Sequence, residues 1–272
     1  MSTGWLDDGC PWHQVNGRDG VRVTLVETLD TSINSWLNRL TLSSAGLASP
    51  RQAGATATAP RGNAIDLVLV HDESGSMWRH SGLPPAGAVA ARQALELVGA
   101  QDDRFGYVGF GSADLDVHIP LTLIAGPADR AALARRIEGT SSHKGWSDYD
   151  AALFAAVDAF QKGDGRYARP GYVVAGRALG ILFVSDGCPR LDAHRAVQVD
   201  DLASFASVDL LRRRRWRVFT IGVGGAARGP EASAILDAVA RRTGGRHYAA
   251  ETPDRLPEAY ASIIRVLRGF SA

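Results

Sequence analysis

The sequence predicts an α/β domain of the doubly wound, Rossmann-like kind: a mostly parallel six-stranded sheet with one antiparallel edge strand and helices on both faces. Three observations support this prediction. From residue 64 onward, short apolar runs of strand length alternate with longer segments of helical periodicity, as in βαβ crossovers. The run Ala64–Val70 (AIDLVLV) is almost continuously apolar, which indicates a central strand covered on both faces. The joint Gly111–Asp116 is too short for a crossover, so the strand that follows it should be antiparallel.

The other elements follow in chain order. Short apolar runs predict further strands at Phe105–Phe110, Val117–Leu123, Leu179–Val184, Arg217–Val223 and Arg246–Ala249. Helical spacing of apolar side chains predicts helices at Ala86–Ala100, Ala128–Ile137, Tyr149–Phe160, Asp201–Arg213, Pro230–Thr243 and Asp254–Leu267. Pro84 and Pro85 suit the start of the first helix, and Pro120 favours a sheet edge for its strand. The segment Lys162–Arg177 contains five glycines or prolines and is expected to be an exposed loop.

Residues 1–60 form a separate N-terminal extension in this prediction, and residues 61–272 form the main domain. Val21–Thr28 alternates apolar and polar residues, which predicts a strand. Apolar residues from Ile33 to Leu40 recur at helical spacing. Thr41–Asn63 is rich in Ser, Ala, Gly, Thr and Pro and is expected to be a linker, which places the boundary near Arg61.

Composition narrows the class of function. The net charge of +1 argues against nucleic acid or an anionic membrane as the main partner. Two cysteines, Cys10 and Cys188, are too few for a disulfide-rich scaffold or a four-cysteine zinc site. No apolar run has the length of a membrane span, and residues 1–20 do not resemble a signal peptide, so we expect a cytoplasmic protein.

Oxygen-bearing side chains follow or precede three of the predicted elements. His71–Met77 (HDESGSM) comes directly after the central strand, Gly145–Asp148 (GWSD) precedes a helix, and Val184–Gly187 (VSDG) ends another buried strand. Because ligands bind at the carboxyl ends of parallel strands, these three turns should meet at one edge of the sheet. Hydroxyl and carboxylate oxygens are the donors that Mg²⁺ prefers. The sequence therefore predicts a cation site there, although Asp and Ser also favour ordinary turns and helix caps.

The segment Asp72–Ser76 (DESGS) resembles the DxSxS opening of the metal-ion-dependent adhesion site of von Willebrand factor A domains. In that family a later Thr and a later strand-end Asp complete the ligand set; Ser147 falls where the Thr is expected, and Asp186 matches the final Asp. The resemblance covers roughly residues 64–267 and includes the segments 103–110 (DRFGYVGF) and 218–224 (VFTIGVG). Serine at position 147 keeps the hydroxyl but lacks the methyl group that restricts χ1, which predicts a looser third ligand.

The resemblance implies a ligand set of Asp72, Ser74, Ser76, Ser147 and Asp186. The expected cation is Mg²⁺, with Mn²⁺ and Ca²⁺ as other options, held by serine hydroxyls and by aspartates directly or through water. An open coordination position would then accept an Asp or Glu carboxylate of a partner protein. Asp148 is a further acceptor or a substitute ligand in this interpretation.

The expected function is thus metal-dependent protein binding. No general base or nucleophile is evident beside these residues, so we do not expect an enzyme. Bacterial relatives often work beside MoxR-type AAA+ ATPases, and the Ala, Arg and Gly content fits a bacterial source, so such an ATPase is the implied partner. Two alternatives stay open: a Mg²⁺-dependent hydrolase or phosphotransferase that uses Asp72, and a scaffold without metal-dependent binding.

Two further features have a simpler interpretation. His71 beside the site is expected to be a surface or packing residue, because oxygen-ligated Mg²⁺ sites seldom include imidazole. The arginine run Arg212–Arg215, with Arg217, could suggest nucleic-acid binding. At the end of a predicted helix, however, such a run also complements the helix macrodipole, and the low net charge favours that interpretation.

Overall fold

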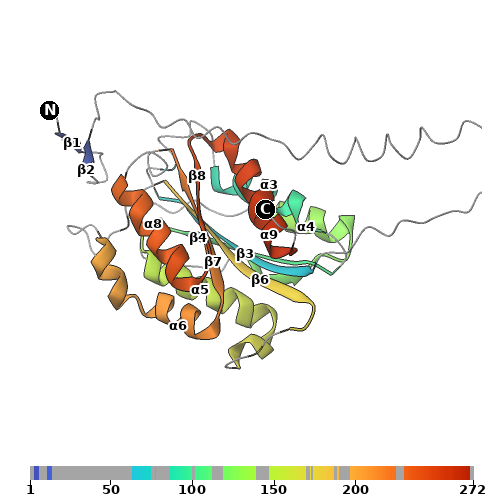
Figure 1. Ribbon diagram of the computed structural model, residues 1–272. Coiled ribbons are helices and arrows are strands. Elements are labelled where there is room, and N and C mark those ends of the chain that lie inside the picture. Colours follow the sequence, from blue (N-terminus) through green and yellow to red (C-terminus); the bar gives the residue numbers. More distant parts are fainter. Residues whose placement is uncertain are drawn as a thin grey trace, which may run out of the picture. The chain divides into compact units, whose positions relative to one another are not determined.

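The computed structural model describes residues 3–5, 11–13, 63–74, 77, 86–99, 102–111, 119–138, 147–169, 172, 174–186, 189, 197–224 and 230–269. A six-stranded sheet dominates this part of the chain, and Figure 1 shows helices on both of its faces. Its strands are β3 (Ala64–Asp72), β4 (Arg104–Phe110), β5 (Ile119–Leu123), β6 (Arg177–Ser185), β7 (Arg217–Val223) and β8 (His247–Ala250). A separate antiparallel pair joins β1 (Thr3–Trp5) to β2 (Pro11–His13), which the sequence did not predict.

The strand order is β5-β4-β3-β6-β7-β8. All neighbours are parallel except β5, which pairs antiparallel with β4 at the edge of the sheet. This confirms the predicted fold class, including the antiparallel edge strand that contains Pro120.

Two hydrophobic cores lie on the two faces of the sheet. The central strand β3 serves both, because successive side chains point to opposite faces: Leu67 and Leu69 lie in one core and Val68 and Val70 in the other. The helices α5 (Tyr149–Gly163), α6 (Ala206–Arg214) and α8 (Pro230–Thr243) contribute to the core around Val68. The helices α3 (Ala86–Leu97), α4 (Pro127–Glu138) and α9 (Leu256–Leu267) contribute to the core around Leu67. Among the described residues no helix is long and apolar enough to cross a membrane.

Two of the predicted segments are wrong in detail. The helix expected at Asp201–Arg213 is divided into the 3-10 helix η2 (Val199–Ser204) and α6, because Phe205 is extended and buried between them. The segment Lys162–Arg177 is not simply an exposed loop. It contains the end of α5, the 3-10 helix η1 (Gly165–Ala168) and the start of β6, and Tyr167 within it is 2% exposed.

Tyr167 is buried because its ring and its hydroxyl both have partners. The ring packs edge-on against Phe160, with centroids 5.4 Å apart, and against Trp216 at 5.6 Å. Its hydroxyl donates a hydrogen bond to the carboxylate of Asp66 in β3. The glycine and proline content of this segment therefore predicted an exposed loop wrongly, because Tyr167 anchors the segment to the sheet.

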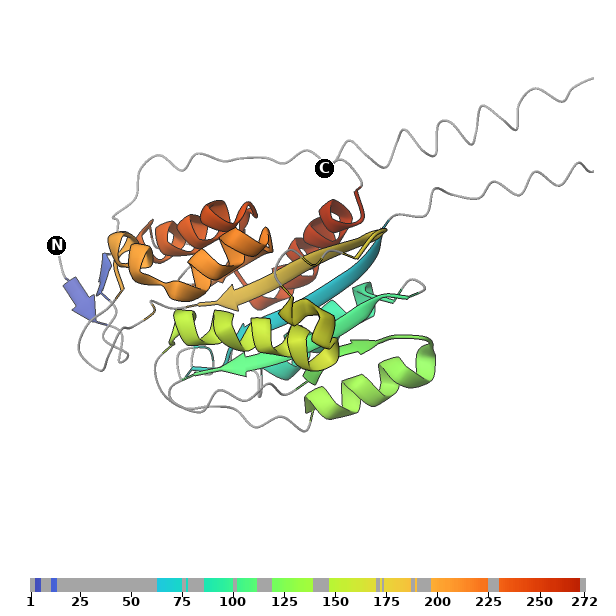
Figure 2. The same ribbon diagram turned by 90° about the horizontal axis from the view of Figure 1, so that it is seen from below.

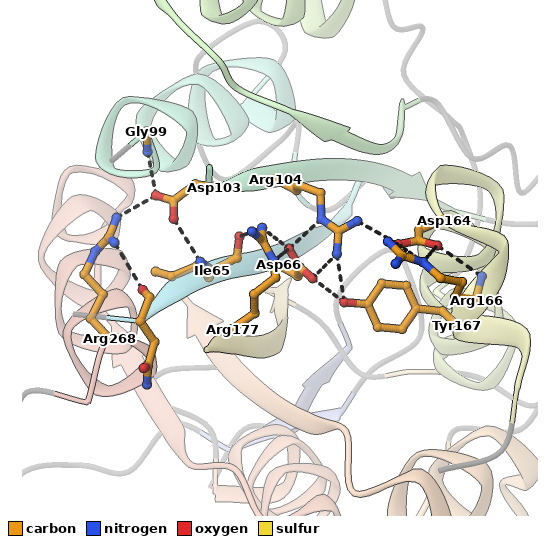
Figure 3. Close-up of polar contacts among 11 residues, drawn as sticks. Ile65, Asp66, Gly99, Asp103, Arg104, Asp164, Arg166, Tyr167, Arg177 and Arg268 are labelled. Atoms are coloured by element: carbon orange, nitrogen blue, oxygen red, sulfur yellow. Dashed lines mark hydrogen bonds and ion pairs between the residues drawn. The ribbon is translucent and has the colours of Figure 1, made fainter. Parts of the chain in front are cut away.

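Asp66 is the centre of a buried charge network at the amino end of the sheet (Figure 3). Arg104 donates to it through Nε at 2.7 Å and also through Nη2, and Arg177 donates through Nε at 2.8 Å and also through Nη2. Arg104 extends the network to Asp164 at 3.0 Å. Although burial acts to raise the pKa of Asp66, the hydrogen bonds from Arg104, Arg177 and Tyr167 hold it below its usual value.

Three other features were predicted for the N-terminal extension and lie outside the described residues: the strand Val21–Thr28, the helix from Ile33 to Leu40 and the boundary near Arg61. They stay predictions.

Candidate functional site

Three turns that are distant in the sequence meet at the carboxyl edge of the sheet. Asp72 is the last residue of β3, Ser147 lies just before α5, and Ser185 is the last residue of β6. The strands β3 and β6 are direct neighbours and parallel, so their ends lie side by side. The helix α5 starts at this edge because Asp148 caps it: its carboxylate accepts a hydrogen bond from the backbone N–H of Ala151 at 3.0 Å.

The carboxylate of Asp72 joins the three turns. Its Oδ2 accepts hydrogen bonds from the Ser147 hydroxyl at 2.8 Å and from the Ser185 hydroxyl at 2.5 Å. Its Oδ1 accepts from the backbone N–H of Ser74 at 2.9 Å, which holds the turn after β3 in place. Asp72 itself is completely buried. One carboxylate therefore fixes the positions of hydroxyls contributed by two other turns.

Buried aromatic side chains hold this arrangement in place. Tyr149, the first residue of α5, donates a hydrogen bond from its hydroxyl to Ser185 Oγ at 2.8 Å. Its ring packs edge-on against Phe183 at 4.7 Å and against Phe110 at 6.0 Å. Burial, with the nearby charge of Asp72, raises the pKa of Tyr149 well above its ordinary value, so its hydroxyl stays protonated and remains a donor.

Two carboxylates lie close enough at this edge to affect each other. Burial raises the pKa of Asp72 to about 6, and the negative charge of Asp186 acts in the same direction, while hydrogen bonds from Ser185 and Ser74 oppose the shift. Among the described residues, none forms an ion pair with Asp72. A buried carboxylate that has hydroxyl and amide donors but no cationic side chain is a favourable place for a bound cation.

The donor set at this edge suits a hard divalent cation. Ser74 is 3% exposed, Ser147 4% and Asp186 8%, so these oxygens lie at a shielded edge of the sheet. Within the described residues no three His, Cys, Asp or Glu side chains gather in a metal-binding arrangement, so a site here depends on the serine hydroxyls. Hydroxyl oxygens with two carboxylates match the preference of Mg²⁺ for oxygen ligands.

The structure brings Asp72 into contact with Ser147 and with the backbone of Ser74, and it places Asp186 within electrostatic range. Ser76 lies outside the described residues. Asp148, considered as a further acceptor or substitute ligand, serves as the cap of α5.

No role for Ser185 or Tyr149 was predicted from the sequence. The position of Ser185 at the strand end beside Asp186 is the signal that could have identified it.

The residues next to Asp72 on the other face of the sheet are also buried. The Glu73 carboxylate accepts a hydrogen bond from the Tyr107 hydroxyl at 2.5 Å, and the backbone N–H of Glu73 donates to Phe110 O at 2.7 Å. Gly109 leaves the space for Glu73, since a Cβ there would come within 2.5 Å of its carboxyl group. Burial lowers the pKa of His71 to about 4, so its imidazole is neutral at pH 7.

The sequence was compared with models of protein families and with curated proteins. Residues 67–187 match the family model described as von Willebrand factor type A domain. No curated protein matches the chain.

Among solved structures, a von Willebrand factor type A protein from Catenulispora acidiphila is 17% identical with a TM-score of 0.52, covering 74% of this chain and 42% of that one. Proximal thread matrix protein 1 from the mussel byssus is 14% identical with a TM-score of 0.56, covering 76% of this chain and 48% of that one. The conserved hypothetical protein BatB from Bacteroides thetaiotaomicron is 14% identical with a TM-score of 0.53, covering 76% of this chain and 99% of that one.

This chain thus spans less than half of the first two structures. The structural likenesses show a shared fold, and the family match covers residues 67–187 of this chain.

Proposed function

We propose that this chain is a protein-interaction module whose carboxyl-edge site binds a divalent cation, Mg²⁺ in the first instance, and through it a carboxylate of a partner protein. The observation that carries the proposal is the convergence on Asp72: one buried carboxylate accepts hydroxyl hydrogen bonds from Ser147 and Ser185, which belong to two other turns. The von Willebrand factor type A domain, which the family match supports, belongs to a family that often mediates protein–protein interactions.

The residues present fit the cation. Ser74, Ser147 and Asp186 would hold it together with Asp72, and Ser76 completes the set by its place in the sequence motif. When bound, the cation supplies positive charge between two carboxylates and a coordination position for an external Asp or Glu. The chain's own contribution is orientation: Asp72 aligns the serine hydroxyls, and Tyr149 holds Ser185 from below.

Binding is favoured over catalysis by the chemistry of the neighbouring groups. His71 is buried, neutral and on the strand position whose side chain points away from that of Asp72, so it does not serve as a general base there. Tyr149 keeps its proton because its pKa is raised. As the partner we propose a MoxR-type AAA+ ATPase complex in the cytoplasm.

Calorimetric titration of Mg²⁺ and Mn²⁺ into the EDTA-treated protein tests the cation. The wild-type chain should bind, and Asp186→Asn should bind at least about tenfold more weakly, because it removes one of two negative charges. At about 100 times the dissociation constant, the cation should add about 2.7 kcal/mol to the free energy of unfolding.

Asp148→Ser is the matched control. It also removes a carboxylate from the edge of the sheet, but it keeps an oxygen acceptor at the cap of α5. The proposal predicts near wild-type cation affinity for this variant. Equal affinity in all three proteins would overturn the assigned site.

The partner is tested by affinity purification from the native host with and without EDTA, alongside Asp186→Ala. Proteins retained by the wild-type chain alone, and released by EDTA, are expected. Identical retained proteins in all three samples would contradict metal-mediated recognition. Metal-dependent turnover of a generic phosphate ester, lost in Asp72→Ala, would favour the enzyme alternative.

A further inference from the structure

Exposed arginines gather at the end of the domain opposite to the candidate cation site. Some belong to the last turns of α6 and α8, and the others lie at or just before the amino ends of β7 and β8. Figure 2 shows that α5, which begins near Asp72, runs back along the sheet toward this other end. We call this surface the arginine end and define it by Arg212, Arg213, Arg215, Arg217, Arg242 and Arg246, all of which are exposed.

The elements that carry these arginines are neighbours in the fold. The helices α6 and α8 contact each other. The chain turns sharply after each helix: Trp216 N–H donates to Leu211 O at 2.9 Å, and Gly245 N–H donates to Ala240 O at 2.9 Å. A Cβ placed on Gly244 would lie 3.9 Å from Cγ of Arg217, so the Arg217 side chain passes directly beside the end of α8.

The charge of this surface is not balanced locally. Among the residues that the structure describes, no acidic side chain forms an ion pair with Arg215, Arg217, Arg242 or Arg246. Arg212 and Arg213 share a single carboxylate, Asp209, at 2.9 and 3.4 Å. The whole chain carries a net charge of only +1, so the excess of positive charge here is a local feature.

Complementing the helix macrodipole explains part of the cluster but not Arg215. Arginines in the last turn, such as Arg212 and Arg242, stabilise a helix end. Arg215 lies beyond the last turn of α6 in the left-handed region, with φ 58° and ψ 32°. The helix α8 ends in the same kind of turn, with glycine at the corresponding position, Gly244, at φ 80°. A left-handed conformation is costly for a residue with a Cβ, so an arginine at this position opposes the backbone preference.

The chemistry of the surface favours acidic protein over nucleic acid. Single-stranded nucleic acid is bound by aromatic side chains that stack on bases, yet Trp216 is 5% exposed and Tyr167 2%. The Arg214 guanidinium covers the Trp216 ring at 5.1 Å from its centroid. The guanidinium groups that define this surface can pair with carboxylates in a planar, bidentate manner.

We propose that the arginine end is a second interaction surface, which binds an acidic segment rich in Asp and Glu on a partner protein. Arg215, Arg217, Arg242 and Arg246 supply the charges that have no ion-pair partner in the described part of the chain. This binding needs no cation and is independent of the carboxyl-edge site.

Fluorescence anisotropy with a labelled oligoglutamate peptide, in the presence of EDTA, tests the proposal on the full chain. The wild-type protein should bind the peptide, and added salt should weaken binding, because exposed charges are screened. The double variant Arg215→Glu, Arg242→Glu should bind about tenfold more weakly. Arg215→Gly, which removes one guanidinium and suits the backbone, should also bind more weakly while remaining folded.

The matched control is Arg92→Glu, Arg135→Glu, which changes the total charge equally with exposed residues of α3 and α4. It should change the affinity less than about twofold. Equal weakening in both double variants would show attraction by total charge alone and overturn the proposal. Absence of peptide binding by the wild-type chain would also overturn it, as would tighter binding of an oligothymidylate of the same charge.

Discussion

The buried network around Asp66 allows a sharp prediction of stability. Asp66 is completely buried, and the side chains of Arg104 and Arg177 are each 14% exposed. Replacing Asp66 by Asn keeps the shape of the side chain but removes its negative charge. The nearly buried guanidinium group of Arg177 then loses its counter-charge, Arg104 keeps only Asp164, and the amide nitrogen of Asn would face arginine donors. Removing one partner from a buried ion pair typically costs about 3–5 kcal/mol, which is the expected loss in the free energy of unfolding.

Urea unfolding at pH 7 measures this loss, with Asp209→Asn as the control. Asp209 also pairs with two arginines, but its side chain is 50% exposed, so the control should lose less than about 1 kcal/mol. A loss below about 1 kcal/mol for Asp66→Asn as well would refute the reasoning, because it would mean that the guanidinium groups find water or other partners at little cost.

The difference in stability between wild type and Asp66→Asn should change with pH in a definite direction. The pKa of Asp66 is lowered in the folded protein, so its contribution is fully present above the pKa of an unfolded Asp and is lost as pH falls through the folded pKa. The stability difference between wild type and Asp66→Asn should therefore be largest near neutral pH and shrink in acid. A difference that grew on acidification would contradict the direction of the shift.

Three further substitutions should change the free energy of unfolding in a definite direction. Arg215→Gly should stabilise the protein by about 1 kcal/mol, since it relieves the left-handed backbone of a residue with a Cβ; a lower melting temperature would count against this. Tyr260→Phe should be neutral or stabilising by up to about 1 kcal/mol in urea unfolding, because the buried Tyr260 hydroxyl has no hydrogen-bond partner among the described residues, and a clear loss would reveal a missed partner. Gly163→Ala should destabilise by about 1–3 kcal/mol, since a Cβ at that position would come within 2.2 Å of the Leu121 carbonyl oxygen, and an unchanged midpoint would show that α5 shifts freely on β5.

Local patterns in the sequence were sufficient for the order and type of most elements. The apolar run of β3 and the helical spacing of α8 are properties of neighbouring residues, and the structure places both elements where they were expected. The short joint before β5 also predicted its antiparallel pairing. The division of the expected helix at Phe205 was missed, because it depends on contacts with a distant segment: Asp150 of α5 accepts hydrogen bonds from the backbone N–H and the hydroxyl of Ser207.

Polar contacts between distant residues could likewise be predicted only in part from the sequence. The convergence of three turns followed from parallel strands having their carboxyl ends at one edge, and this placed Asp72 and Ser147 together. The network of Asp66 with Arg104, Arg177 and Tyr167 joins residues up to 111 positions apart, and no local pattern specifies those partners. A charged residue within the otherwise apolar strand β3 was nevertheless a signal that buried counter-charges had to exist.

The two proposed surfaces recognise the same chemical group, a carboxylate, by different means and at opposite ends of the sheet. Between them lies the length of a strand such as β7, whose seven residues span about 20 Å at a rise of about 3.3 Å per residue. This exceeds the screening length of about 8 Å at physiological salt, so charge at one end has little effect on affinity at the other. An acidic segment that followed α6 or α8 from one end to the other would also meet Asp209 and Asp237, which repel it. EDTA should therefore release only partners held at the carboxyl edge, and charge reversal at Arg215 only those held at the arginine end, so that one purification with both perturbations assigns each partner to its surface.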